Sequence, residues 1–471
     1  MKRIAVAGGG ISGLAIAWAI RTRDPRADVL VLERSTRTGG NIRTEQVDGY
    51  ICEAGPDGFL DNAPDTLQLV RAIGLESQLL PSDEAARRRY IFLNGALREV
   101  PSSPGAFLTT PLLSLPGKLR VACEPFAPRR GDAEESIYEF ASRRIGEEAA
   151  SILVDSMVSG IFAGDSRALS LRACFPKMWQ LEDEHGGLFR ALVATRRHRR
   201  KGDAVGAPSG RLTSFTGGMS DLIERLTQKL DDVVRISAPV LELRKTSDVQ
   251  GYRSGWPATG YSLATGRGEI EADAVILAGP SADSAALLHT FDPVLAAALE
   301  QIPSAPLAVV CLGYDAAEVA RYCSLDGFGF LVPRGQNVRI LGALWESSIY
   351  PNRAPSGKAL LRVMIGGACD RDAVTLDDRE LVSAVRGDLA RTMGLACAPE
   401  FTRIIRHRRG IPQYVKGHLA RMRRIETLLQ VHPGLFLAGN SYRGVSLNAC
   451  VSEAEHIAER VLRQVAESPA A

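Results

Sequence analysis

Several patterns that would mark other protein classes are missing from this chain. Its eight cysteines include no CxxC pair, and its seven histidines show no metal-ligand spacing, which excludes the common zinc and dithiol motifs. Aromatic residues make up only 6%, and a formal net charge of +3 gives no overall basic character that would indicate nucleic-acid binding. No apolar run reaches the roughly 18 residues of a membrane-spanning helix. We therefore expect buried thiols in a reducing compartment, no bound metal and no nucleic acid.

Glycine, by contrast, is frequent, with 45 residues, and its first concentration lies near the N-terminus. Basic and apolar residues up to Ile20 imitate a secretory signal, but Gly8, Gly9, Gly10 and Gly13 interrupt its apolar centre. A nucleotide-binding turn needs these glycines and a signal does not. The length of 471 residues predicts two or three domains.

The N-terminal segment has the order of elements typical of dinucleotide binding. An apolar strand at residues 4–7 leads into G-x-G-x-x-G at residues 8–13, which opens an apolar-faced helix. A second apolar strand follows at residues 29–32 and ends at Glu33. Because strand, turn, helix, strand and acid occur in order, the pattern predicts a dinucleotide site rather than a chance glycine turn.

Each part of that fingerprint has a physical role. Gly8 permits the tight turn, Gly10 lets the backbone approach a pyrophosphate, and Gly13 lets the helix pack against the sheet. The free N–H groups at the helix start then face the pyrophosphate. Glu33, twenty residues after Gly13, can accept hydrogen bonds from a ribose diol.

Two further segments favour FAD over a nicotinamide cofactor. Arg37 and the pair Gly39-Gly40 follow the acid closely, and this loop can fold over the pyrophosphate with added charge and backbone donors. Gly55-Pro56-Asp57 forms a stiff turn after an expected strand at residues 50–52. Nicotinamide-dependent dehydrogenases do not need these elements, whereas flavoproteins often have them.

Motifs along nearly the whole chain resemble the amine-oxidase-like flavoprotein superfamily and, within it, the porphyrinogen oxidases. The motifs shared with the wider superfamily lie at residues 8–13, 33–40 and 55–56. The more specific ones lie at residues 159–165, 327–333, 341–344, 351–355, 365–367, 410–414 and 437–444.

The resemblance implies an α/β plus α+β fold with three parts. These are a discontinuous Rossmann-like FAD domain (1–85, 211–290 and 430–471), a mixed-sheet substrate domain (86–100 and 291–429) and a helical lobe of the membrane-binding type (101–210). The sequence itself predicts helices at residues 59–82 and 134–158, a last strand at 435–438 and a final helix at 448–466.

The resemblance also implies the site residues, and no catalytic residue is among them. The cofactor-binding set is Gly8, Gly10, Ile11, Ser12, Gly13, Glu33, Arg34, Arg37, Gly39, Gly40, Gly55, Pro56, Asp57, Val240, Ala278, Gly439, Asn440, Val445, Ser446 and Leu447. The substrate-binding set is Gly160, Phe328, Leu331, Leu344 and Met364, which would enclose a flat apolar ring.

The chain departs from the family pattern at two positions. Plant and animal relatives carry arginine where Asp57 stands, and relatives often have tryptophan near His407. Propionate recognition must therefore be arranged differently, and the candidate anion partners are Arg87 to Arg89, residues 196–201 and Arg353. Each of these basic groups could equally be a solvated surface.

The implied activity is oxygen-dependent oxidation of a porphyrinogen in haem biosynthesis, in three two-electron rounds through FAD with release of peroxide. Protoporphyrinogen IX is the first expectation for the substrate and coproporphyrinogen III the alternative. An amine oxidase or carotenoid desaturase is a further alternative, but Val445 cannot supply the aromatic half of an amine cage. A non-catalytic dinucleotide-binding protein remains a third.

The expected partners are the porphyrinogen, molecular oxygen, a second copy in a homodimer and a ferrochelatase that takes the product. The expected location is the cytoplasm, with peripheral contact on the inner face of the cell membrane as the alternative. An apolar patch at residues 107–115 and the basic residues 196–201 would make that contact.

Overall fold

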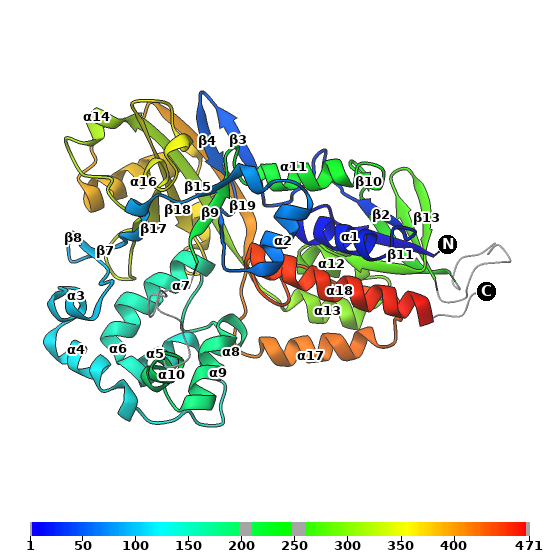
Figure 1. Cartoon of the computed structure of the whole chain (residues 1–471), viewed down its shortest axis with the longest axis horizontal. Coiled ribbons are helices and arrows are strands. Elements are labelled where there is room, and N and C mark those ends of the chain that lie inside the picture. The colour runs from blue at the N-terminus through cyan, green and yellow to red at the C-terminus, as the bar shows by residue number, and fades with distance from the viewer. Residues whose placement is uncertain (1, 197–209, 247–259, 468–471) are drawn as a thin grey trace.

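Five parallel strands form the sheet that carries the N-terminus in this computed structural model, which describes residues 2–196, 210–246 and 260–467 (Figure 1). Their order is β10–β2–β1–β14–β20, so strands from distant parts of the chain pair directly. The bounds are β1 Arg3–Ala7, β2 Asp28–Leu32, β10 Val234–Arg235, β14 Ala274–Leu277 and β20 Leu435–Leu437. This sheet therefore places strands from the first, middle and last parts of the chain side by side, with their carboxyl ends on the same side.

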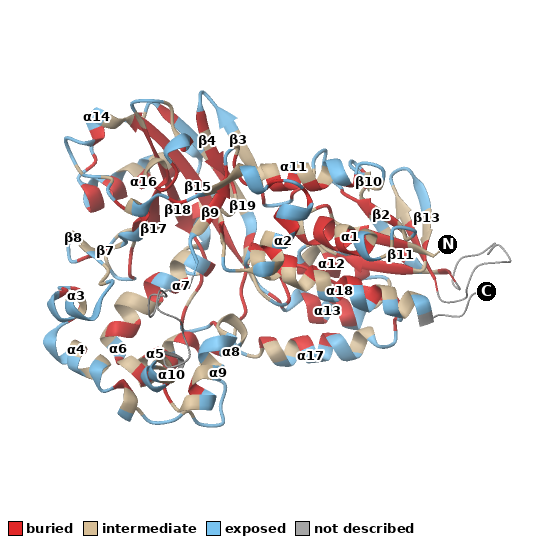
Figure 2. Ribbon diagram, viewed as in Figure 1, coloured by how far each residue is buried: buried red, intermediate tan, exposed pale blue. Residues whose placement is uncertain are grey.

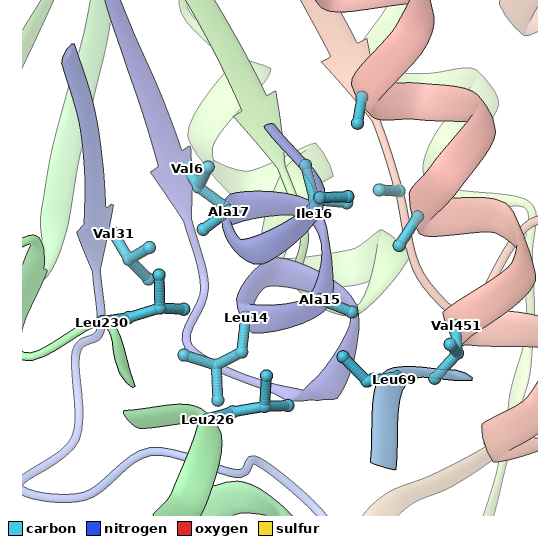
Figure 3. Packing of buried hydrophobic residues seen from close by; sticks show 14 of the residues in the cluster. Val6, Leu14, Ala15, Ile16, Ala17, Val31, Leu69, Leu226, Leu230 and Val451 are labelled. Carbon is cyan, nitrogen blue, oxygen red and sulfur yellow. The ribbon is translucent and has the colours of Figure 1, made fainter. Parts of the chain in front are cut away.

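Both faces of this sheet are buried, as the continuous apolar strands predict (Figure 2). On one face Ile4 and Val6 pack against helices, and Figure 3 shows Val6, Leu14 and Val31 within this cluster. The helices on that face are α1 Ile11–Arg23, α2 Pro64–Ala72, α11 Ser220–Lys229 and α18 Leu447–Glu467.

The opposite face packs against a small antiparallel sheet and three helices. The sheet consists of β11 Val240–Lys245, β12 Tyr261–Thr265 and β13 Gly268–Ala272. The helices are α12 Ser281–Leu288, α13 Pro293–Glu300 and α17 His418–Leu429. Met422 and Ile425 place α17 in the same apolar cluster as Ala5 and Val275, although its residues fall in the range expected for the substrate domain.

A seven-stranded mixed sheet forms the second part of the molecule, in the order β19–β15–β18–β17–β16–β7–β8. Its strands are β7 Tyr90–Leu93, β8 Ala96–Glu99, β15 Ser304–Asp315, β16 Gly329–Leu331, β17 Ile340–Trp345, β18 Lys358–Gly366 and β19 Phe401–Pro412. Only the β16–β7 pair is parallel. Helix α16 Asp378–Met393 covers one face of the sheet, and short helices α14 Ala316–Val319 and α15 Glu346–Ile349 follow two of its strands.

Two small sheets connect these parts. The hairpin β3 Thr44–Val47 and β4 Tyr50–Glu53 packs on the larger sheet, where Tyr50 stacks on Phe401 with ring centroids 4.5 Å apart. The strands β5 Phe59–Leu60, β9 Leu212–Phe215 and β6 Leu79–Pro81 form the other.

The third part is a lobe of short helices, drawn at the lower left of Figure 1. It contains α3 Pro104–Thr109, α4 Leu115–Ala122, α5 Ile137–Ile145, α6 Glu147–Ala149, α7 Asp155–Phe162, α8 Leu171–Cys174, α9 Pro176–His185 and α10 Leu188–Arg196. A π-helical segment at Ala150–Val154 joins α6 to α7. None of the described helices is long and apolar enough to cross a membrane.

The last strand and the last helix are confirmed, but the two helices expected in the first third of the chain are shorter and broken. Within residues 59–82 the helix runs only from Pro64, which fixes the first turn, to Ala72, because Gly74 turns the chain at φ 77°. Within residues 134–158, Gly146 at φ 92° separates α5 from the next turn.

Candidate flavin and substrate site

One continuous cavity of about 2330 Å³ runs from the edge of the parallel sheet to the seven-stranded sheet and the helical lobe. Nearly all of the residues expected in the site line it. These are Gly8, Gly10, Ile11, Ser12, Glu33, Arg34, Gly39, Gly40, Gly55, Pro56, Asp57, Val240, Ala278, Gly439, Asn440, Val445, Ser446 and Leu447, together with Gly160, Phe328, Leu331, Leu344 and Met364. Gly13 and Arg37 lie behind its wall instead.

The glycine turn forms an open cradle at one end of this cavity. Gly8 has φ 121° and lies against the backbone of Ala278. A Cβ on Gly10 would meet nothing within 4 Å, whereas a Cβ on Gly13 would lie 1.9 Å from the carbonyl oxygen of Gly8. No side chain caps the start of α1 at Gly10, so its first amides are left for a ligand. The turn therefore fits a pyrophosphate, with Gly13 as the packing position behind it.

Glu33 lies at the end of β2 with its carboxylate held by the backbone. One oxygen accepts from the N–H of Gly9 and the other from the N–H of Ser35, both at 2.8 Å. Each oxygen keeps a lone pair that a ribose hydroxyl can use.

Arg37 shapes the adjacent loop rather than lining the cavity. Its guanidinium donates to the carbonyl oxygens of Thr38 at 2.8 Å and Gly40 at 2.7 Å. Burial and the neighbouring Arg43 lower the pKa of Arg37. Its positive charge is therefore directed to the carbonyls that curve the Gly39-Gly40 loop.

The Gly55-Pro56-Asp57 turn is held from the larger sheet. The guanidinium of Arg362 donates to the carbonyl oxygen of Glu53 at 3.1 Å and also to that of Gly55. His407 Nε2 donates to the carbonyl oxygen of Ala54 at 2.8 Å, and burial lowers the pKa of His407, which favours the neutral ring. His407 lines the cavity at the position where the sequence suggested a smaller substitute for tryptophan.

The far end of the cavity is a mostly apolar slot. Leu344 on β17 pairs with Gly329 on β16, which sets Phe328 and Leu331 along the same wall. Gly160 on α7 closes the opposite side, and a Cβ there would lie 2.7 Å from Leu331 Cδ2. The contact is possible only because α7 presents a glycine at this point.

The candidate anion partners differ sharply in their surroundings. Arg87 pairs with Glu84, and Arg88 pairs with Asp326. The described residues give Arg89 no carboxylate; its guanidinium lies 5.1 Å from the ring centroid of Phe328, and desolvation lowers its pKa. Arg89 is thus the cavity-lining arginine best placed to receive an anion.

Two other candidates do not serve in the way that the sequence suggested. Arg353 is fully buried away from the cavity, where its Nη2 donates to Ser214 Oγ at 2.6 Å and lies 3.6 Å from Glu53 Oε1. Arg353 is therefore not a free cation for a substrate, and that interpretation was wrong. Its charge compensates the buried carboxylate of Glu53 instead. The cluster at residues 196–201 lies outside the residues whose side chains the structure describes.

Sequence reasoning missed Tyr414, which fixes the loop before α18. Its hydroxyl donates to the carbonyl oxygen of Asn440 at 2.6 Å and accepts from the N–H of Gly444 at 2.7 Å. The residue lies in the 410–414 motif, but no local pattern indicates a partner some thirty positions away. Among the described residues no group of side chains could hold a metal ion.

The glycine cradle, the ribose-facing acid and an adjoining apolar slot define a flavin-dependent oxidoreductase. The family model described as flavin containing amine oxidoreductase matches residues 11–462. The chain therefore belongs to the flavin-containing amine oxidoreductase family, and its cofactor is FAD.

Named relatives match along nearly the full length. The chain is 35% identical to the chloroplastic protoporphyrinogen oxidase of Oryza sativa subsp. japonica, over 97% of this chain and 87% of the relative. It is 31% identical to the coproporphyrinogen III oxidase of Bacillus subtilis (strain 168), with 96% of each covered. A crystal structure titled putative protoporphyrinogen oxidase from Exiguobacterium sp. 255-15 superposes with a TM-score of 0.82 at 28% identity, covering 99% of each chain.

Proposed function

We propose that this chain oxidises a porphyrinogen to the corresponding porphyrin in haem biosynthesis, with FAD as the bound oxidant and molecular oxygen as the final acceptor. Relatives that carry this activity in their names match the chain at 30–35% identity over nearly its whole length. When bound, FAD accepts two electrons and one hydrogen from a meso carbon in each round. The protein orients the ring, excludes water and places charge.

The size and composition of the cavity are the observation that carries the proposal. Its volume of about 2330 Å³ exceeds the roughly 300–1,000 Å³ of a pocket for one small ligand, so it has room for a dinucleotide and a second large molecule. The second half is walled by Phe328, Leu331, Leu344 and Met364, which suit a broad apolar ring. A porphyrinogen has that shape and carries propionates at its edge.

Arg89 supplies the charge that such a substrate needs. Its guanidinium lies over the ring of Phe328, one of the apolar wall residues, and has no competing carboxylate among the described residues. A propionate can therefore pair with Arg89 while the ring contacts Phe328 and its neighbours. Arg89 would thus take the role of the arginine that plant and animal relatives carry after the Gly-Pro pair, where this chain has Asp57.

Protoporphyrinogen IX, with two propionates, is our first assignment, because it asks for fewer cationic partners and Arg89 is the cavity-lining arginine best placed for one propionate. Coproporphyrinogen III, with four propionates, is the alternative, and the match to the coproporphyrinogen III oxidase of Bacillus subtilis favours it. The test is a parallel assay of the flavin-loaded protein with each substrate under air, followed by porphyrin fluorescence. A higher kcat/KM for one assigns the substrate; no turnover of either, with active control enzymes, would refute the proposal.

The lobe suggests where the protein works. Leu108, Leu115, Leu119 and Phe126 are 60–85% exposed on α3, α4 and the turn that follows. Lys118 and Arg120 lie between them in the chain. We include in the proposal that this surface makes peripheral contact with a lipid bilayer, which would present an apolar substrate to a cavity that reaches Phe107 and Met157.

A further inference from the structure

Helix α7 forms one wall of the apolar slot but does not belong to the sheet that forms the other wall. Met157, Gly160 and Ile161 on α7 line the cavity, and the helix contacts strands β16 and β17. Through Val158 and Phe162, α7 also packs inside the helical lobe. The width of the slot therefore depends on what fixes α7 against the sheet.

The end of α7 is held by hydrogen bonds to its last carbonyl groups. The carbonyl oxygen of Phe162 accepts from Gln413 Nε2 at 2.8 Å, and that of Ala163 accepts from the N–H of Ala368 at 2.7 Å. Ala163 has the left-handed conformation, with φ 46°, that ends the helix. These contacts fix the C-terminal end of α7, and the start of the helix needs a separate attachment.

Arg334, in the loop that follows β16, supplies this attachment. Its Nε donates to Asp155 Oδ2 at 2.7 Å, and its Nη2 donates to the other oxygen of Asp155. Nη2 also lies 2.8 Å from Asp165 Oδ1 and 3.3 Å from Ser166 Oγ. The hydrogen bonds to Asp155 raise the pKa of Arg334. These four residues form a clamp that links the larger sheet to the chain on both sides of α7.

The burial of Asp155 gives this ion pair a weight that an exposed pair lacks. The side chain of Asp155, the first residue of α7, is only 4% exposed, whereas that of Arg334 is 37% exposed. Apart from Arg334, the donor to this carboxylate among the described residues is the Ser166 hydroxyl, at 2.5 Å. Removal of Arg334 would leave a buried carboxylate without a cation, which regains its stabilisation only by reaching water. The start of α7 would therefore shift toward solvent.

The clamp and the slot contact lie on the same two elements. Leu331, three residues before Arg334, contacts Gly160, which lies five residues after Asp155. At 1.5 Å per residue, about 7.5 Å of helix separate Asp155 from Gly160, so a shift of the first turn reaches the slot. Arg334 and Asp155 themselves are not among the residues that line the cavity.

We infer that Arg334 and Asp155 are positioning residues for the oxidation of the porphyrinogen, because through α7 they set the width of the slot that receives the ring. They act through the contact of Gly160 with Leu331 rather than on the substrate directly. The inference rests on the proposed function, since it concerns the binding of a flat apolar substrate. The sequence placed residues 159–165 in a family motif and gave Asp155 and Arg334 no role.

The first test compares two ion pairs of one loop in the flavin-loaded full chain. Arg334→Gln should raise KM for the porphyrinogen about 10-fold and keep kcat within about three-fold, because a wider slot weakens binding of substrate and transition state equally. Arg334→Lys keeps the charge without the paired donors and should restore part of the KM. Arg339→Gln is the matched control, since Arg339 lies in the same loop, is 44% exposed and donates twice to Asp370 at 2.9 Å, outside α7.

A double variant gives a readout that a merely structural role would not move. If the clamp holds α7 against Leu331, a helix released by Arg334→Gln can accommodate the methyl group of Gly160→Ala. The KM of the double variant should then lie close to that of Arg334→Gln alone, below the product of the two single effects. Effects that multiply, a wild-type KM in Arg334→Gln, or an equal rise in Arg339→Gln would overturn the inference.

Hydrogen exchange without substrate separates the inference from the proposed function. The amides of α7 should exchange faster in flavin-loaded Arg334→Gln than in the wild type, while those of α16 stay unchanged. Exchange in α7 equal to that of the wild type overturns the inference. If neither wild type nor variants oxidise a porphyrinogen while α7 still exchanges faster, the proposed function fails and the hold of the clamp on the slot stands.

Discussion

At the scale of single residues, the site gives different surroundings to identical residues that are neighbours in the sequence. Arg87, Arg88 and Arg89 are consecutive, yet the first two are neutralised by Glu84 and Asp326 and the third is not. The chemistry of each arginine follows from which carboxylate lies within reach, and that carboxylate is three residues away for Arg87 but 238 residues away for Arg88.

Replacement of Arg89 tests its assignment as the propionate partner. Arg89→Met should raise KM for a porphyrinogen about 10-fold or more, since a hydrogen bond to a charged group contributes roughly 1.5–3 kcal/mol. kcat should change little, because the contact is made equally before and during reaction. Steady-state kinetics of Arg89→Met beside Arg88→Met provide the measurement; equal rises in KM for both variants would contradict the assignment.

Glu53 predicts a pH dependence of stability. Burial raises the pKa of Glu53 from 4.5 to about 7, so the folded state holds its proton more tightly than the unfolded chain. Its contribution is complete below about pH 4.5 and is lost as pH rises through 7, a change of about 3 kcal/mol at 1.36 kcal/mol for each pKa unit. Thermal unfolding of wild type and Glu53→Gln between pH 4.5 and 8 should show the variant gaining relative stability as pH rises. The exposed Glu242→Gln serves as control, and parallel curves for Glu53→Gln and wild type would refute the prediction.

At the scale of elements, the approach of α7 to β16 sets the width of the apolar slot. A methyl group on Gly160 would lie 2.7 Å from Leu331 Cδ2, the end of a flexible side chain. Gly160→Ala should therefore still fold, with Leu331 turned into the cavity. Because this overpacking costs about 1 kcal/mol of substrate binding, KM should rise several-fold.

The control is Gly387→Ala on α16, where an added Cβ meets nothing within 4 Å. That variant should keep the wild-type KM. Its free energy of unfolding should rise by up to about 1 kcal/mol, because alanine has a higher helix propensity than glycine. If Gly160→Ala has wild-type KM and melting temperature, the slot does not depend on this contact.

Elements with short-range signals could be predicted, and those that depend on distant partners could not. The glycine turn, β1 and β2 follow from a local pattern in which each residue has one clear role. The helix expected at residues 59–82 is wrong at both ends, because its apolar residues also suit β5 and β6, which pair with β9 from residues 212–215. Arg353 and Tyr414 took their roles from contacts with Ser214 and Gly444, which no spacing reveals.

At the scale of the whole molecule, the exposed apolar side chains of the lobe predict binding to a surface. Leu108→Glu and Phe126→Glu, at positions 72% and 85% exposed, should not disturb the fold but should weaken sedimentation with anionic phospholipid vesicles. Val294→Glu and Val431→Glu change apolar residues elsewhere that are 52% and 64% exposed, and they should have no effect. Loss of binding in all four variants, or in none, would contradict contact through the lobe.

The order of strands in the parallel sheet has a consequence for synthesis of the protein. β20 and the loop at residues 439–447 are translated after every other strand of the parallel sheet, yet they complete the sheet begun by β1 and one wall of the cavity. The pairing of β14 with β20 can therefore form only after residues 435–437 have been synthesised. Because the cavity gains this wall only with residues 439–447, we expect the complete cofactor site to form after the glycine turn at residues 8–13 has waited for a segment more than four hundred positions away.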